Sequence, residues 1–144
     1  GKVLTSADYT VIYASGRKNV GSYTVTVKMK GNYSGSFTKT FRILPKGTKF
    51  TSVKAAKKSF TAKWSAQKTQ TTGYQLQYTT DKKFKKSVKT VTTSKNTVVK
   101  TTVKKLAAKK TYYVRIRTYK TVKINGKNTK LYSGWTTAKK VKTK

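Results

Sequence analysis

The sequence of 144 residues contains no cysteine, no histidine and no glutamate, and its only acids are Asp8 and Asp81. Without an imidazole, a thiol or a neighbouring pair of carboxylates, the sequence does not support catalytic triads, cysteine nucleophiles, zinc sites or carboxylate-pair catalysis. We therefore expect no catalytic residue, no metal site and no cofactor. The absence of cysteine leaves the redox compartment open, because exported bacterial proteins as well as cytosolic ones do without disulfides.

Long apolar runs and proline are also scarce. No apolar stretch approaches the ~20 residues that span a bilayer, so we expect no transmembrane segment. Low mean hydropathy together with a formal net charge of +33 is typical of disordered chains. The pattern indicates a folded chain instead, because aromatic residues make up 12%, proline occurs once and threonine and valine recur in alternating runs. We therefore predict an all-β protein with a cationic surface.

The chain carries 35 lysines and arginines against two acids, and four of these cations are arginine: Arg17, Arg42, Arg115 and Arg117. Lysine attracts any polyanion as a solvated point charge, whereas specific DNA contacts depend on planar, bidentate groups. The expected partners are therefore polyanions bound by diffuse electrostatics: teichoic acid, sulfated glycan, nucleic acid or an acidic membrane surface. The alternative is a lysine coat that only keeps the protein soluble and protects sheet edges.

The Leu44-Pro45-Lys46-Gly47 stretch is the only Pro-Gly punctuation, and it divides the chain into residues 1–45 and 46–144. In the first part we predict strands over residues 8–13, 22–30 and 36–43, separated by glycine-rich turns. Tyr23, Val25, Val27 and Met29 alternate with polar residues. This alternation is typical of an antiparallel sheet that packs on one side.

The amino-acid sequence of residues 1–45 resembles the second half of a bacterial Ig-like surface repeat. The stretch that carries this resemblance is LTSADYTVIYASGRKNVGSYTVTVKMKGNYSGSFTKTFRI. The resemblance implies an incomplete module whose first strands precede Gly1. Such a sheet exposes an open edge, or it is completed by a β-strand or a neighbouring module from elsewhere. An arbitrary boundary of the sequence is the alternative explanation.

The second part has strand-like stretches every 8 to 15 residues and no helical period, which favours a β-sandwich. We predict that Phe60, Ala62 and Trp64 face inward. Three further stretches alternate in the same way, and their expected inward-facing residues are Tyr74, Leu76 and Tyr78; Val99, Thr101 and Val103; and Tyr112, Val114, Ile116 and Thr118. Asn125-Gly126 predicts a tight turn, and the last strand is expected over residues 131–141.

These features resemble a fibronectin type III domain over about residues 48–144. Four of them carry the resemblance: Trp64, the Tyr74-x-Leu76-x-Tyr78 strand, the Leu106 and Tyr112 corner, and the YSGWT segment that contains Trp135. The resemblance implies a sandwich in which Trp64 and Tyr112 are structural and the Tyr112 hydroxyl bonds upstream backbone. The family's usual Pro and Gly before the corner tyrosine are replaced by Ala108 and Lys109.

Tyr113, Arg115, Arg117 and Tyr119 alternate onto one face that we expect to meet solvent. Such a stripe can stack bases or sugars while it contacts anions, so these residues are candidate polyanion contacts. The YSGWT segment is similar to the element of cytokine-receptor type III domains in which aromatic rings interleave with arginines. That resemblance implies the other interpretation, in which Trp135 packs on Arg115 or Arg117 and covers the face.

Five consecutive residues, Lys82, Lys83, Phe84, Lys85 and Lys86, form the other candidate polyanion contact. Phe84 can serve as an apolar anchor among charges, or it can be a core plug at the edge of the sandwich.

The hypothesis that follows is a non-catalytic spacer, anchor or adhesion unit of an exported bacterial surface or cell-wall protein, held near polyanions by its lysines. A dedicated nucleic-acid-binding protein is the alternative. An enzyme with a lysine nucleophile is a third class, and it requires a desolvated lysine of low pKa in a pocket.

Overall fold

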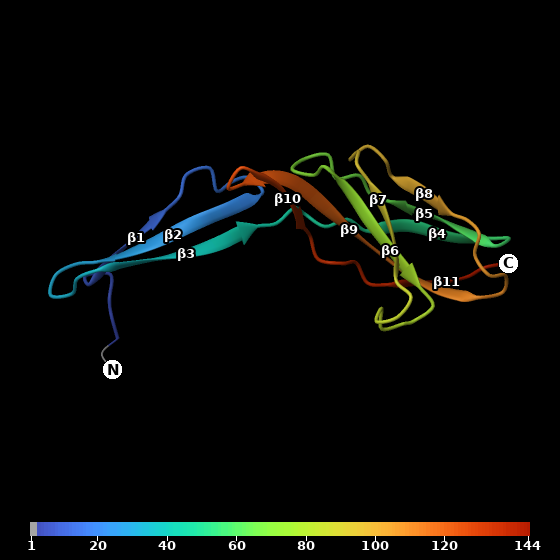
Figure 1. Cartoon of the computed structure of the whole chain (residues 1–144), viewed down its shortest axis with the longest axis horizontal. Coiled ribbons are helices and arrows are strands. Elements are labelled where there is room, and N and C mark those ends of the chain that lie inside the picture. The colour runs from blue at the N-terminus through green and yellow to red at the C-terminus, as the bar shows by residue number, and fades with distance from the viewer. Residues whose placement is uncertain (1–2) are drawn as a thin grey trace.

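The computed structural model describes residues 3–144 as eleven β-strands in three antiparallel sheets. Figure 1 shows an elongated arrangement with a three-stranded sheet at one end and a sandwich at the other. In the described range no helix is long and apolar enough to cross a membrane. The predicted all-β class is confirmed.

The first sheet consists of β1 (Tyr9–Tyr13), β2 (Gly21–Met29) and β3 (Ser36–Ile43), in the order β1-β2-β3. The register places Tyr9 opposite Met29 and Val27 opposite Phe37, so one face is apolar apart from Lys39. Its members are Tyr9, Val11, Tyr13, Tyr23, Val25, Val27, Met29, Phe37, Lys39, Phe41 and Ile43.

The predicted amphipathic alternation of this sheet is present, but the expected packing on one side is not. Among residues 3–144 no second layer lies over the apolar face, and Tyr13 and Phe37 are 52% and 48% exposed. Three strands alone bury too little apolar surface to exclude water from one face. The sheet therefore presents an uncovered apolar face and two open edges.

The sandwich packs two sheets against each other. One contains β4 (Phe50–Ala56), β5 (Ser59–Trp64) and β8 (Lys100–Val103); the other contains β6 (Gly73–Thr79), β7 (Lys89–Thr93), β9 (Thr111–Ile124), β10 (Lys127–Tyr132) and β11 (Lys139–Lys142). Period-two alternation in both sheets supplies the inward side chains. The core comprises Phe60, Ala62, Trp64, Tyr74, Leu76, Val103, Leu106, Tyr112, Val114, Ile116 and Val141.

The expected last strand over residues 131–141 is in fact two strands, β10 and β11, that pair with different halves of β9. Between them the chain is irregular, and hydroxyl groups replace backbone carbonyls as acceptors. The Thr118 N–H donates to Ser133 Oγ at 3.0 Å, and the Ile116 N–H donates to Thr136 Oγ1 at 3.1 Å. Side-chain oxygen atoms therefore accept hydrogen bonds from those β9 N–H groups that have no backbone carbonyl of a paired strand opposite them.

Val99 also differs from its expected inward position. It precedes β8 and is 36% exposed, whereas Val98 packs against the core in its place. Alternation holds only within a strand, and this strand begins at Lys100.

The corner tyrosine has the hydrogen bond that the resemblance implies. The Ala107 N–H donates to the Tyr112 hydroxyl at 3.2 Å. Lys109, which stands where the family usually has glycine, has a φ of 52°. The turn therefore keeps its left-handed geometry, and a lysine adopts a conformation that glycine accommodates with less strain.

Candidate functional site

Rings and guanidinium groups alternate in one stack on the outer face of β9. Arg117 Cζ lies 3.7 Å from the centroid of the Tyr132 ring and 4.2 Å from that of Trp135. Arg115 Cζ lies 4.4 Å from the Trp135 ring and 4.1 Å from the Phe84 ring. Each guanidinium thus lies between two rings, an arrangement that contributes cation–π attraction on both sides. We call these five residues the arginine stack.

Two glutamines of β6 hold the guanidinium groups in place. Arg117 Nε and Nη2 donate to Gln75 Oε1 at 2.9 and 2.6 Å, and Arg115 Nε and Nη2 donate to Gln77 Oε1 at 3.1 and 2.8 Å. Gln75 lies opposite Arg117 in the register, and Gln77 lies opposite Arg115. A neutral amide oxygen orients each arginine without cancelling its charge.

Burial lowers the pKa of Arg115, and it is also the main cause that lowers the pKa of Arg117. The ordinary pKa of a guanidinium lies so far above neutral pH that both groups stay charged. Their positive charge persists, but their planar faces are occupied by rings. The stack therefore offers no free guanidinium face for a base or a sugar.

Tyr119 was expected at the solvent face, and this expectation is wrong. Its side chain is 2% exposed, and its hydroxyl donates to the Thr93 carbonyl at 3.1 Å. The ring lies over Gly73, its direct cross-strand neighbour, where the absence of a side chain leaves room for it. Tyr113 is half-buried and outside the arginine stack. Of the two predicted tyrosine contacts, only Tyr113 has a surface that a ligand can reach.

Phe84 neither plugs the core nor projects as an isolated anchor. It is absent from the core cluster, and its ring covers the outer side of the Arg115 guanidinium. Lys82, Lys83, Lys85 and Lys86 around it are all exposed in the connection between β6 and β7. The structure thus links this lysine run to the arginine stack, which the separation of 31 positions between Phe84 and Arg115 concealed in the sequence.

Asp81 organises the lysine run. Its carboxylate accepts hydrogen bonds from the backbone N–H groups of Lys83, Lys85 and Lys86 at 2.9, 2.8 and 3.0 Å. The bond from Lys83 is the largest cause of a lowered pKa for this carboxyl group, followed by the bond from Lys85. The turn therefore depends on the ionised carboxylate.

We expect the turn to loosen in acid. A lowered pKa in the folded protein means that the stabilising effect is complete above the ordinary carboxyl pKa of about 4 and is lost as the pH falls through the folded value. The amide resonances of Lys83, Lys85 and Lys86 should shift together below about pH 4, and in Asp81→Asn they should not titrate. Amide shifts that stay constant to pH 2 in the unmodified chain contradict this assignment.

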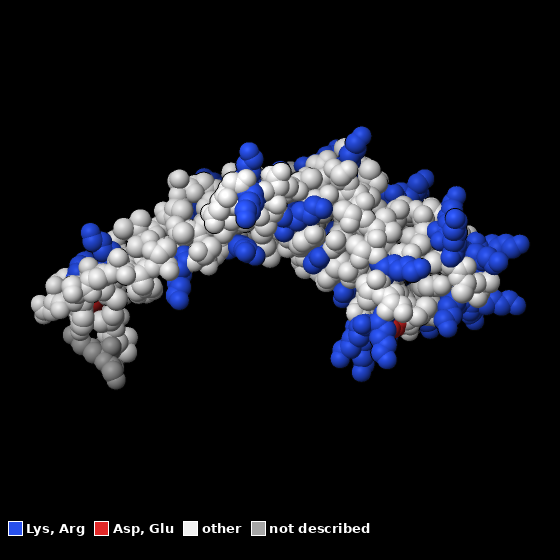
Figure 2. Space-filling model, in the orientation of Figure 1, with Lys and Arg blue, Asp and Glu red and all other residues white. Residues whose placement is uncertain are grey.

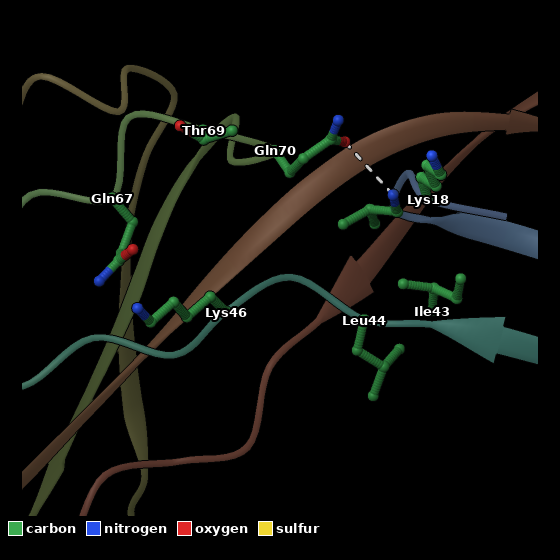
Figure 3. A pocket seen from close by; sticks show the side chains of 8 residues that line it. Lys18, Ile43, Leu44, Lys46, Gln67, Thr69 and Gln70 are labelled. Carbon is green, nitrogen blue, oxygen red and sulfur yellow. Dashed lines mark hydrogen bonds between the residues drawn. The ribbon is translucent and has the colours of Figure 1, made fainter. Parts of the chain in front are cut away.

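A hollow of about 380 Å³ lies at the seam between the first sheet and the sandwich (Figure 3). Lys18 and Lys46 lie at its wall, together with Leu44 from the end of β3. Gln70 ties the seam, because its Nε2 donates to Asn19 Oδ1 at 2.6 Å and its Oε1 accepts from the Val20 N–H at 3.3 Å. The lining contains no nucleophile paired with a base, so we interpret the hollow as a module junction.

Cationic side chains cover much of the surface. Every described lysine except Lys120 is exposed. Figure 2 shows them over the whole length of the molecule, with dense groups on the β6–β7 connection and at the end of the sandwich that carries the C terminus. The charge is thus distributed, with a local concentration at the predicted Lys82–Lys86 run and another that the fold assembles from separate segments at the C-terminal end.

The family model for the fibronectin type III domain matches residues 44–133, more than half of the chain. The chain belongs to the fibronectin type III family. Two solved structures are similar to it: chicken CNTN1 FN1–FN3 domains, with 17% identity and a TM-score of 0.57, and a two-domain type III segment of chicken tenascin, with 21% identity and a TM-score of 0.54. A comparison with curated proteins found no match.

These likenesses show the fibronectin type III fold alone. They cover 87% and 86% of this chain, which spans only 43% and 66% of the CNTN1 and tenascin structures. Fibronectin type III domains are generally non-catalytic binding or spacer modules. The family match does not reach residues 1–43, for which the bacterial Ig-like resemblance stays a prediction.

The sequence did not reveal which residues hold the guanidinium groups of the arginine stack in place. Gln75 and Gln77 hold the guanidinium groups, and only the β6–β9 register brings them to the stack. A signal was present, since the two glutamines alternate with the apolar residues of β6. Alternation predicts a shared face but not the strand that lies opposite.

Proposed function

We propose that this fibronectin type III chain is a spacer, anchor or adhesion unit of an exported bacterial surface or cell-wall protein, and that its lysines hold it near polyanions. The position is extracellular or wall-associated. Counterion release from phosphate or sulfate polymers supplies the attraction, so binding weakens as salt rises.

One observation carries this proposal: the positive charge is not compensated within the molecule. The two acids are engaged in local turns, where Asp8 Oδ2 accepts from the Thr5 N–H at 2.9 Å and from its hydroxyl at 3.0 Å, and Asp81 binds backbone N–H groups. The lysines therefore remain available to anions from outside.

Retention of the chain on wall teichoic acid, heparin and duplex DNA should fall steeply across a salt series. A plot of log affinity against log salt should be linear, with a slope that reflects several released counterions, about 0.7 to 0.9 for each phosphate contact. Chemical acetylation of the lysines is the control, and it should abolish retention on all three polymers. Retention that is indifferent to salt, or that is absent at low salt, contradicts the proposal.

A dedicated nucleic-acid-binding protein is the second candidate, which the net charge and the accessible Tyr113 favour. The occupied faces of the arginine stack and the buried Tyr119 speak against base stacking there. DNA that binds more tightly than a sulfated glycan of matched charge density, with the difference lost in Tyr113→Ala, would favour this candidate.

We also propose that residues 1–45 are part of a bacterial Ig-like repeat whose second layer comes from a neighbouring β-rich segment. The uncovered apolar face and the open edges of β1 and β3 support this. The parent coding sequence tests it directly, because strand-forming sequence should precede Gly1. An initiator codon immediately before Gly1 contradicts it.

A further inference from the structure

Three connections that are distant in the sequence meet at the C-terminal end of the sandwich. The Lys58 N–H donates to the Lys144 carbonyl at 2.9 Å, and the Leu106 N–H donates to the Lys58 carbonyl at 2.9 Å. The Thr143 N–H donates to the Lys110 carbonyl at 3.0 Å, and Thr143 Oγ1 donates to the Ala107 carbonyl at 2.6 Å. Backbone hydrogen bonds therefore hold the β4–β5 turn, the β8–β9 connection and the C-terminal residues together.

The two connections and the C-terminal residues together carry seven exposed lysines, and Figure 2 shows dense positive charge at this end of the molecule. We call these lysines the terminal lysine cluster: Lys57, Lys58, Lys104, Lys105, Lys109, Lys110 and Lys144. Like charges held this close repel one another and raise the free energy of the folded state. The same concentration of positive charge increases the attraction of an anionic chain.

The backbone of the cluster is also costly for lysine. Lys58, Lys105 and Lys109 have φ values of 47°, 59° and 52°, in the left-handed region that glycine occupies without strain. Gln70, Phe84 and Ser87 outside the cluster also have positive φ values, so the strain alone does not distinguish the cluster. Backbone strain combined with crowded charge is typical of residues that serve binding rather than stability.

The side chains of the cluster restrict the chemical class of ligand that it can bind. The three segments contain no arginine, and the rings in the hollow that Lys105 lines offer little surface for stacking bases, because Tyr112 is 9% exposed and Tyr78 is half-buried. Leu106 is 7% exposed, so it does not provide an apolar anchor for a membrane. A duplex is stiff over about 50 nm, whereas a flexible chain can follow three separate loops. Ammonium groups alone suit small, flexible, repeated anionic groups.

We infer that the terminal lysine cluster is a binding site for a flexible phosphodiester polymer without bases. This inference rests on the proposed function and assigns its attraction to one end of the molecule. The anionic chain lies across the β4–β5 turn, the β8–β9 connection and the C-terminal residues, and its phosphates replace repulsion between lysines with attraction.

The test uses poly(glycerol phosphate) as the probe and replaces all three strained lysines: Lys58→Gly, Lys105→Gly and Lys109→Gly. At 0.1 M salt the affinity should fall about tenfold or more, and the salt slope should become shallower by about 2. The melting temperature should rise by about 5 °C, because strain and repulsion are both relieved. The control removes the same charge near the first sheet through Lys28→Gln, Lys30→Gln and Lys39→Gln, which are exposed and lie outside both candidate polyanion contacts, and its affinity should fall less than threefold.

Each other outcome overturns a different part of the inference. An equal loss in both triple variants leaves the proposed diffuse attraction intact but removes the site, whereas an unmodified chain that does not bind at low salt removes the proposed function itself. A fall in melting temperature in the cluster variant contradicts the assigned strain. Tighter binding of single-stranded DNA overturns the exclusion of bases, and tighter binding of a sulfated glycan of matched charge density overturns the phosphodiester assignment.

Discussion

Gly73→Ala should destabilise the sandwich by about 3 kcal/mol or more, above most overpacking substitutions. A Cβ atom at this position would lie 2.0 Å from the Thr93 carbonyl oxygen and 3.1 Å from Tyr119 Cε1. The carbonyl cannot move away easily, because it accepts the Tyr119 hydroxyl and belongs to the strand that pairs with β6. The methyl group must therefore separate β6 from β7 or displace the tyrosine ring.

Gly134→Ala is the matched control for this substitution. A Cβ atom at Gly134 meets no heavy atom within 4 Å, so we expect a change within about 0.5 kcal/mol. Urea unfolding followed by tryptophan fluorescence measures both variants. Equal stability of the Gly73→Ala and Gly134→Ala proteins would show that Tyr119 does not lie on Gly73 as described.

Arg117→Ala should cost about 2 to 3 kcal/mol of unfolding free energy. The guanidinium makes two hydrogen bonds to Gln75 and lies between the Tyr132 and Trp135 rings, so its loss removes charge-assisted bonds and two cation–π contacts together. Arg117→Lys should recover less than half of this loss. A lysine has neither the planar face nor the fork that fits one amide oxygen.

Arg42→Ala is the control, because Arg42 is exposed on the polar face of the first sheet and outside the arginine stack. We expect a change below about 0.5 kcal/mol in urea unfolding. If Arg117→Ala costs no more than Arg42→Ala, the stack does not contribute to stability. A fully stable Arg117→Lys variant would likewise show that charge alone is sufficient.

The long strand β9 carries the two arginines of the arginine stack and pairs with a different strand at each of its ends. Its first half pairs with β11, its middle carries Arg115 and Arg117, and its last residues pair with β10. Lys123 and Ile124, at its end, line a hollow together with Tyr23 of β2. The end of β9 therefore lies beside the first sheet without pairing with any of its strands.

The connection between the first sheet and the sandwich is also held in place at the seam. The Thr118 hydroxyl donates to the Lys46 carbonyl at 2.8 Å, and Pro45 is buried, so the connection between the two predicted parts is packed against the sandwich. A short connection with a buried proline restricts movement at the boundary. The division at residues 45 and 46 itself stays a prediction.

Much of the fold could be predicted because period-two alternation is a local property. Tyr74, Leu76, Val114 and Ile116 alternate with polar residues, and this alone indicates which face is buried. The tight turn at Asn125-Gly126 follows from the φ angles that these residues tolerate. Val99 and the interrupted last strand were missed, because strand ends depend on hydrogen-bond partners from other strands.

The site depended more strongly on the tertiary structure. Gln75 and Gln77 join the arginine stack only through the β6–β9 register, Phe84 only through the path of the β6–β7 connection, and Tyr119 is buried only because Gly73 lies opposite. The terminal lysine cluster likewise requires backbone hydrogen bonds between residues 58, 106 and 144. The amino-acid sequence by itself determined the charge, the lack of reactive groups and the amphipathic strands, because these follow from composition and local period. Only the tertiary structure decided which charges share a surface and which rings are covered, because both depend on contacts between residues far apart in the chain.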